Sequence, residues 1–137
     1  MKSASRSEAS TVTESDHEFL SNRRILVVED DPFISMDLEE ILTAAGVREV
    51  ERAPSVDIAL AALGKTRPDA VLLDLNLRGV RSIPVARVLK SSGIPFLLTS
   101  GYSRSQIDEP LLNDVPLVPK PVLPSKLLAA LQELLAD

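Results

Sequence analysis

Residues 25–32 read Ile-Leu-Val-Val-Glu-Asp-Asp-Pro, and this stretch decides the fold. Its first four residues are apolar without alternating polar positions, which is typical of a strand buried on both faces of a parallel sheet. Pro32 suits the first position of a helix, with Asp31 as its N-cap. Apolar residues then recur at helical spacing as far as Gly46. The stretch therefore predicts a strand–loop–helix unit with acidic residues in its loop.

The same unit recurs along the rest of the chain. Further strands are predicted at 47–52, 69–73, 94–99 and 115–118, and further helices at 55–63, 84–92, 105–112 and 124–135. The helix at 105–112 has the least regular pattern, because the segment is polar and contains Pro110. Strands that alternate with helices through short connections predict an α/β fold, a flavodoxin-like doubly wound (βα)5 sandwich with a parallel sheet in the order 2-1-3-4-5.

Length and composition are those of one globular domain. The 137 residues fit a single domain, which we expect to span residues 23–137. Residues 1–22 are rich in Ser and Thr, carry acidic residues and have no apolar core of a signal peptide, so we expect a flexible N-terminal tail. No stretch approaches the roughly 18 apolar residues of a membrane span.

Charge and cysteine content narrow the function classes. The net charge of −5 and the lack of any basic run argue against nucleic-acid binding. The chain has no cysteine, which excludes disulfides, thiol catalysis and cysteine-based metal sites. The absence of cysteine also suits a reducing compartment, and we expect a cytoplasmic location without membrane attachment.

Polar residues follow four of the predicted strands at the edge where ligands bind in this fold class. They are Glu29, Asp30 and Asp31, then Asp74 and Asn76, then Thr99 and Ser100, and finally Lys120. Carboxylates that converge in one crevice repel each other unless a cation neutralises them, and oxygen ligands of this type favour Mg²⁺. A carboxylate beside Mg²⁺, a hydroxyl and a lysine can accommodate a transferring phosphoryl group.

Other interpretations of these residues remain open. Taken singly, Asp74 could cap a loop and Lys120 could be an ordinary surface charge. A phosphatase or dehalogenase with an aspartate nucleophile normally needs a second acid two residues after it, and this chain has Asn76 there. Such enzymes also need a cap domain over the substrate. Both requirements argue against this class of enzyme. Glycine-rich nucleotide-binding motifs are absent from the sequence.

Four motifs resemble those of response-regulator receiver (CheY-like) domains, and the resemblance extends from Arg23 to the C-terminus. The motifs are V-V-E-D-D-P at 27–32, L-L-D-L-N-L at 72–77, L-L-T-S-G-Y at 97–102 and P-K-P at 119–121. The resemblance implies a switch rather than a metabolic enzyme, with at most Mg²⁺-dependent self-phosphorylation and autodephosphorylation. It implies that Asp74 is the phosphoacceptor.

The resemblance also implies roles for the surrounding residues. Asp30, Asp74 and the backbone carbonyl of Asn76 would bind Mg²⁺, and Glu29 would act through water. Ser100 and Lys120 would contact the phosphoryl group, and the Lys120–Pro121 bond is expected to be cis.

A narrower similarity is to single-domain receivers of alphaproteobacteria that carry a Pro-Phe…Thr-Gly-Tyr signature, here with Ser100 in place of the threonine. Many receivers have an aromatic residue where this chain has Leu117, and Tyr102 is a candidate substitute in signalling. The similarity implies a histidine kinase, of the HWE class, or a phosphotransfer protein as donor. Output would be a contact with a downstream protein, by a monomer or a phosphorylation-dependent homodimer. A phosphate sink or shuttle, or a degenerate receiver that works without phosphorylation, are the alternatives.

Overall fold

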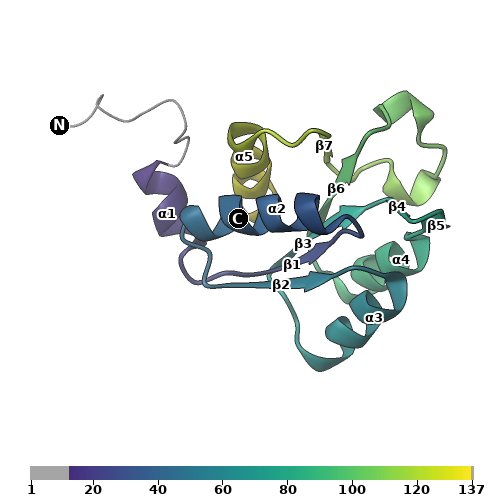
Figure 1. Ribbon diagram of the computed structural model, residues 1–137, viewed down its shortest axis with the longest axis horizontal. Helices are drawn as coiled ribbons and strands as arrows, with labels where there is room; N and C mark the ends of the chain where they lie inside the picture. Colours follow the sequence, from purple (N-terminus) through teal and green to yellow (C-terminus); the bar gives the residue numbers. More distant parts are fainter. Residues whose placement is uncertain (1–12, 137) are drawn as a thin grey trace.

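A five-stranded parallel sheet forms the centre of the computed structural model, which describes residues 13–136 (Figure 1). Its strands are β1 (Arg24–Val28), β2 (Glu49–Ala53), β3 (Ala70–Asp74), β6 (Phe96–Ser100) and β7 (Leu117–Pro119). They lie in the order β2-β1-β3-β6-β7, and every neighbouring pair is parallel. The predicted fold class and the predicted order 2-1-3-4-5 are confirmed.

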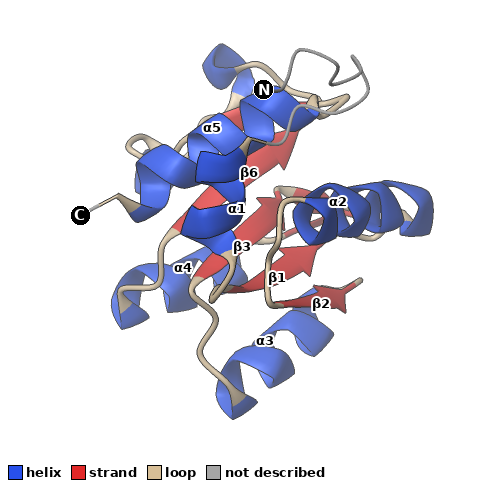
Figure 2. Cartoon of the chain, turned by 90° about the vertical axis from the view of Figure 1, so that its left-hand side faces the viewer, coloured by secondary structure: helices blue, strands red, loops and turns tan. Residues whose placement is uncertain are grey.

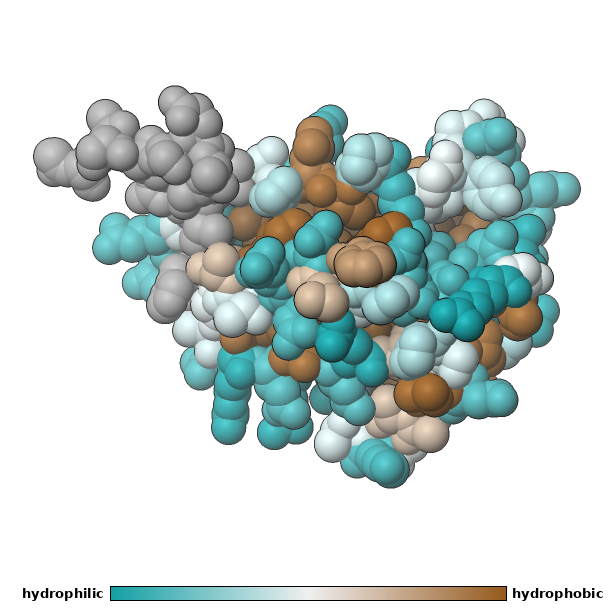
Figure 3. Space-filling model, viewed as in Figure 1, coloured by the Kyte–Doolittle hydropathy of each residue, from teal (hydrophilic) through white to brown (hydrophobic). Residues whose placement is uncertain are grey.

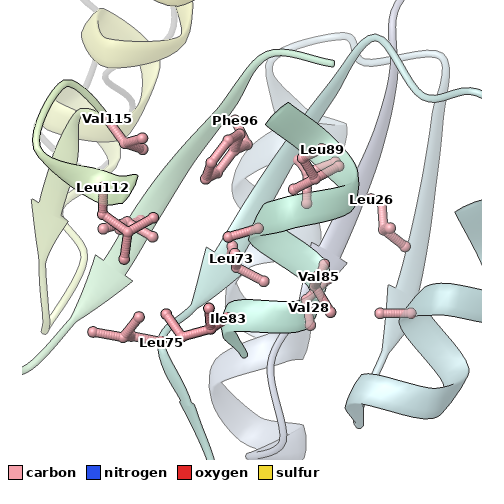
Figure 4. Packing of buried hydrophobic residues seen from close by; sticks show 14 of the residues in the cluster. Leu26, Val28, Leu73, Leu75, Ile83, Val85, Leu89, Phe96, Leu112 and Val115 are labelled. Atoms are coloured by element: carbon pink, nitrogen blue, oxygen red, sulfur yellow. The ribbon is translucent and has the colours of Figure 1, made fainter. Parts of the chain in front are cut away.

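Helices cover both faces of this sheet (Figure 2). The helices α2 (Pro32–Ala44) and α5 (Pro124–Leu135) pack on one face, and α3 (Val56–Lys65) and α4 (Ile83–Ser92) pack on the other. Successive residues of a strand point to opposite faces, so the all-apolar strands supply two cores at once. Leu72 belongs to the core under α2 and α5, whereas Leu73 belongs to the core under α3 and α4, part of which Figure 4 shows.

The predicted helix at 105–112 is wrong. The structure has two short 3-10 helices there, at Arg104–Gln106 and Pro110–Leu112. Pro110 has no N–H to donate, and Glu109 before it is extended, so a continuous helix cannot pass this point. Leu112 nevertheless fills the core under α4 (Figure 4).

The segment after β3 holds a hairpin that the periodicity did not predict. The strands β4 (Asn76–Leu77) and β5 (Val80–Arg81) pair antiparallel through a turn at Arg78 and Gly79. Two-residue strands are too short to show an alternating pattern in the sequence. The hairpin lies next to the carboxyl end of β3 (Figure 1).

Part of the segment expected to be a flexible tail is a helix. Helix α1 (Glu14–Leu20) begins with a capping box, in which Thr13 and Asp16 each accept a hydrogen bond from the other's backbone N–H. Leu20 is fully buried in the core under α2 and α5, and Asp16 Oδ1 accepts a 2.7 Å hydrogen bond from Gln132 of α5. Ordered structure therefore begins before residue 23, and residues 1–12 of the expected tail lie outside the described residues.

We expect the substitution Leu20→Ala to lower the free energy of unfolding by about 2 to 4 kcal/mol, because it removes buried methyl groups and leaves a cavity. Urea unfolding followed by circular dichroism measures this loss. The matched control is Glu18→Ala on the exposed side of the same helix, which should change stability by less than about 0.5 kcal/mol. An unchanged unfolding midpoint for Leu20→Ala would contradict the docking of α1.

The face of the domain shown in Figure 3 mixes polar and apolar side chains. Phe33 and Met36 on α2 are the most exposed of the large apolar side chains on that helix. No helix within residues 13–136 combines the length and the apolar character that crossing a membrane requires.

Candidate functional site

The carboxyl ends of β1, β3, β6 and β7 surround one open hollow. Ten residues line it: Glu29, Asp30, Asp31, Ile34, Asp74, Asn76, Ser100, Gly101, Tyr102 and Lys120. Every site residue predicted from the sequence is among them except Leu117 and the buried Thr99. Leu117 is half-buried in β7 and packs against the core under α4, away from the lining of the hollow.

Three carboxylates meet in this hollow. Glu29, Asp30 and Asp74 each place a carboxylate oxygen within 4.8 Å of the other two. Glu29 and Asp74 are almost fully buried, with 2% and 5% of their surface exposed, whereas Asp30 is partly exposed. Buried carboxylates this close together call for positive charge, and an oxygen-only group of this kind fits a hard divalent cation.

Lys120 supplies part of that positive charge. Its Nζ lies 2.8 Å from Glu29 Oε1 and 3.1 Å from Asp74 Oδ2, so one ammonium bridges two buried acids. Burial alone would lower the pKa of Lys120, but the bonds to Glu29 and Asp74 outweigh burial and raise it. Lys120 therefore keeps its charge.

Unlike Lys120, Glu29 has a pKa that is shifted against its charged form. Burial raises the pKa of Glu29 above its ordinary value, and the negative charge of Asp74 acts in the same direction. The bonds from Lys120 and from the backbone N–H of Asp31, which lies 3.1 Å from Glu29 Oε2, oppose this rise without cancelling it. The site still carries more negative charge than Lys120 can neutralise.

The backbone around Asp74 is fixed by neighbouring polar groups. Asn76 N donates to Asp74 Oδ1 at 3.2 Å, and the buried Ser82 hydroxyl donates to the Asp74 carbonyl at 2.7 Å. Ser82 N also donates to the Leu75 carbonyl at 2.9 Å. Ser82 could not be predicted from the sequence, because nothing in the pattern around it shows that the chain folds back over β3.

Ser100 and Tyr102 form the side of the hollow next to β7. Ser100 Oγ accepts a 2.9 Å hydrogen bond from Tyr102 N, so its own proton is not used in that bond. Lys120 N donates to the Ser100 carbonyl at 2.9 Å, which connects β6 to the segment after β7. The Lys120–Pro121 bond is cis, as expected.

Asp31 and Asp30 have separate surroundings although they are adjacent. Asp31 Oδ1 accepts hydrogen bonds from the backbone N–H groups of Phe33 and Ile34, which confirms Asp31 as the N-cap of α2. Asp30 Oδ2 lies 3.6 Å from Arg78 Nε on the β4–β5 turn. Sequence reasoning missed this ion pair, because it depends on the geometry of the unpredicted hairpin.

Comparisons with known proteins agree with this geometry. Residues 25–132 match the family model described as the response regulator receiver domain. SdrG from Sphingomonas melonis Fr1, an alphaproteobacterial receiver, is 37% identical with a TM-score of 0.73, and the match covers 85% of this chain and 98% of SdrG. A putative response regulator from Chloroflexus aurantiacus J-10-fl is 29% identical with a TM-score of 0.73, covering 84% of this chain and 98% of that one.

The curated relatives are longer than this chain. The DNA-binding response regulator MtrA of Mycolicibacterium smegmatis is 42% identical over 77 residues, which are 56% of this chain and 33% of MtrA. The aligned part thus spans about a third of that relative. The family match covers most of the chain, the sheet has the expected order, and the acidic hollow lies at the expected edge. The chain belongs to the family of response-regulator receiver domains of two-component systems.

Proposed function

We propose that this receiver accepts a phosphoryl group on Asp74 from the phosphohistidine of a histidine kinase or phosphotransfer protein. The observation that carries the proposal is the position of Asp74. Its carboxylate is nearly buried, lies beside two further acids and is bonded to the ammonium of Lys120. Receiver domains act as phosphoacceptor switches, and Asp74 is the strand-terminal acid of the hollow.

In the proposed transfer, a carboxylate oxygen of Asp74 attacks the phosphorus of the donor. The bond between phosphorus and the imidazole nitrogen breaks, and the nitrogen keeps the electron pair. The product on Asp74 is an acyl phosphate, which water later hydrolyses to restore the carboxylate. Because the donor is already reactive, the receiver contributes mainly by positioning the reacting atoms and by neutralising charge.

Lys120 and Ser100 are the proposed partners of the phosphoryl group. The Lys120 ammonium already contacts Asp74, so it is placed to neutralise the added charge. The Ser100 hydroxyl accepts from Tyr102 N and still has its proton to donate to a phosphoryl oxygen. That bond connects Ser100 to the exposed Tyr102, which we propose as the signalling residue in place of an aromatic at Leu117.

Asp30, Asp74 and the backbone carbonyl of Asn76 are the residues that we propose to hold Mg²⁺, with Glu29 acting through water. The cluster of oxygen donors and the excess negative charge beside Glu29 fit a divalent cation. When bound, Mg²⁺ neutralises charge on the transferring phosphoryl group. We propose a histidine kinase of the HWE class as the donor, and this proposal rests on the resemblance of residues 95–102 to the Pro-Phe…Thr-Gly-Tyr signature.

Incubation with a small phosphodonor and Mg²⁺ tests the proposed function. Intact-mass spectrometry should show one added phosphoryl group, and treatment with hydroxylamine should remove it, as expected for an acyl phosphate. A chelator should suppress the gain. A protein that gains no mass under these conditions would instead be a receiver that works without phosphorylation.

Magnesium binding should be visible in tyrosine fluorescence, because Tyr102 is the single tyrosine of a chain without tryptophan and lines the hollow. We expect a saturable change in emission on titration with Mg²⁺. Asp30→Asn should weaken binding by at least about tenfold, because it removes a charged ligand. Asp37→Asn, on the exposed side of α2, changes the net charge equally and should leave the affinity unaltered. Equal affinities for the two variants would contradict the assignment of Asp30.

A further inference from the structure

Arg78 occupies an unusual backbone position. It is the one non-glycine residue with positive φ among the described residues, at 55°, and Gly79 follows at 82°. Two consecutive positive φ angles between paired strands are the pattern of a type I′ turn, in which asparagine or glycine normally takes the first position. A long side chain is unfavourable there. An outlier of this kind beside a functional site suggests a role for the side chain.

The side chain of Arg78 reaches the acidic hollow. Its Nε lies 3.6 Å from Asp30 Oδ2, although most of the arginine is exposed to solvent. The turn that carries Arg78 is attached to the phosphoacceptor strand. Asn76 Oδ1 accepts a 2.9 Å hydrogen bond from Gly79 N, and Asn76 N donates to Asp74 Oδ1. The backbone of Arg78 is therefore fixed relative to Asp74.

Charge explains what the arginine can do there. With all three ionised, the clustered carboxylates carry three negative charges, and Lys120 and Arg78 together supply two positive ones. One negative charge remains in the metal-free site. If a divalent cation takes the place of the guanidinium at Asp30, the cation and Lys120 together balance the three carboxylates. The guanidinium of Arg78 thus neutralises part of the negative charge that a divalent cation would neutralise fully.

We infer that Arg78 is an internal competitor of Mg²⁺, which pairs with Asp30 in the metal-free protein and is displaced from it when the ion binds. The inference rests on the proposed function, since it takes Asp30 as a metal ligand. Arg78 then sets the magnesium concentration at which the receiver becomes competent for phosphorylation. In this role Arg78 sets the affinity for Mg²⁺ without touching the phosphoryl group or the metal.

The expected change in Mg²⁺ affinity follows from the exposure of Arg78 to solvent. Like charges about 5 Å apart near a solvated surface repel by an amount that corresponds to roughly threefold to tenfold in affinity. Salt screens such an interaction, so the difference should shrink as ionic strength rises. A residue that acted only through the shape of the turn would show no such dependence on salt.

Titration with Mg²⁺ tests the inference, followed by Tyr102 fluorescence and independently by isothermal titration calorimetry. Arg78→Asn is the informative variant, because asparagine tolerates positive φ and preserves the turn. Its dissociation constant for Mg²⁺ should fall about threefold to tenfold at low salt, and this gain should largely vanish near about 0.5 M salt. Arg78→Lys keeps the charge and should remain close to the original protein.

Arg81→Ala is the matched control. Arg81 is exposed on β5 of the same hairpin and pairs with Asn76 in the register. Because Arg81 is also an arginine, its removal changes the net charge as much as Arg78→Asn does. Its affinity for Mg²⁺ should stay within about twofold of the original. Equal affinities for Arg78→Asn and the original protein would overturn the competition while leaving the magnesium site intact. If neither Arg78→Asn nor the original protein binds Mg²⁺, the proposed magnesium site is overturned, and the competition with it.

Discussion

Asp74→Asn should abolish phosphorylation, with the rate of phosphoryl gain from a small donor falling by more than about a thousandfold. An amide nitrogen or oxygen at this position is not a competent nucleophile, whereas the side chain keeps its size. The Asn76 N–H and the Ser82 hydroxyl bond to Asp74 in ways that an asparagine can preserve, so the variant should fold. Intact-mass spectrometry over a time course measures the rate.

The control for this prediction is Asp37→Asn, which changes the same functional group at an exposed position of α2. It should gain one phosphoryl group at the original rate. A gain by Asp74→Asn that hydroxylamine still reverses would show that another carboxylate accepts the group. In that case Asp30, which is more exposed than Glu29, would be the next candidate.

Lys120→Met should lower the free energy of unfolding by about 3 kcal/mol in the presence of a chelator. The substitution keeps an apolar stem but removes the ammonium that bridges Glu29 and Asp74, so two nearly buried carboxylates lose their shared partner. Mg²⁺ should restore much of the loss, because a divalent cation replaces the missing charge. The difference between stability with and without Mg²⁺ should therefore be larger for the variant than for the original protein.

The stability loss in Lys120→Met should also depend on pH. Since the pKa of Glu29 is raised in the folded protein, the folded state holds this proton more tightly than the unfolded chain does. Protonation of Glu29 therefore adds to the free energy of unfolding below the ordinary glutamate pKa of about 4.3, and this contribution is lost as pH rises through the higher pKa of the folded state. Without Lys120 the pKa of Glu29 should rise further, so the deficit should be small in acid and largest near neutrality.

Urea unfolding at several pH values, with chelator and with Mg²⁺, measures both effects of Lys120→Met. Lys126→Ala is the control, since Lys126 is exposed on α5 and should matter by less than about 0.5 kcal/mol. A deficit in Lys120→Met that neither acid nor Mg²⁺ reduces would mean that the lysine acts through packing rather than charge.

The strands of the sheet centre were predictable because burial on both faces leaves an unmistakable pattern. β1, β3 and β6 each contain a continuous apolar run, and each was placed to within about two residues. The edge strand β2 reads Glu-Val-Glu-Arg-Ala and is mostly exposed, so its bounds shifted to Glu49–Ala53. The strand-end rule then predicted which side chains would meet, because a parallel sheet collects its carboxyl ends at one edge.

The features that were missed depend on contacts between distant parts of the chain. The ion pair of Arg78 with Asp30 requires a tight turn, and Ser82 reaches Asp74 only because the chain reverses after it. Helix α1 has seven residues, too few to show a helical period, and it depends on α5 for its packing. The capping box at Thr13 and Asp16 was the one local signal for it.

The docking of α1 on α5 also has a consequence for the order of folding. Asp16 and Gln132 are separated by 116 positions, so the contact is among the most non-local that this chain can make. During synthesis, α1 leaves the ribosome before α5, the helix on which it docks, has been translated. The contact between α1 and α5 can therefore form only late in the assembly of the domain. We expect α1 to join after the folding transition state, so that it slows unfolding of the finished domain without speeding its formation.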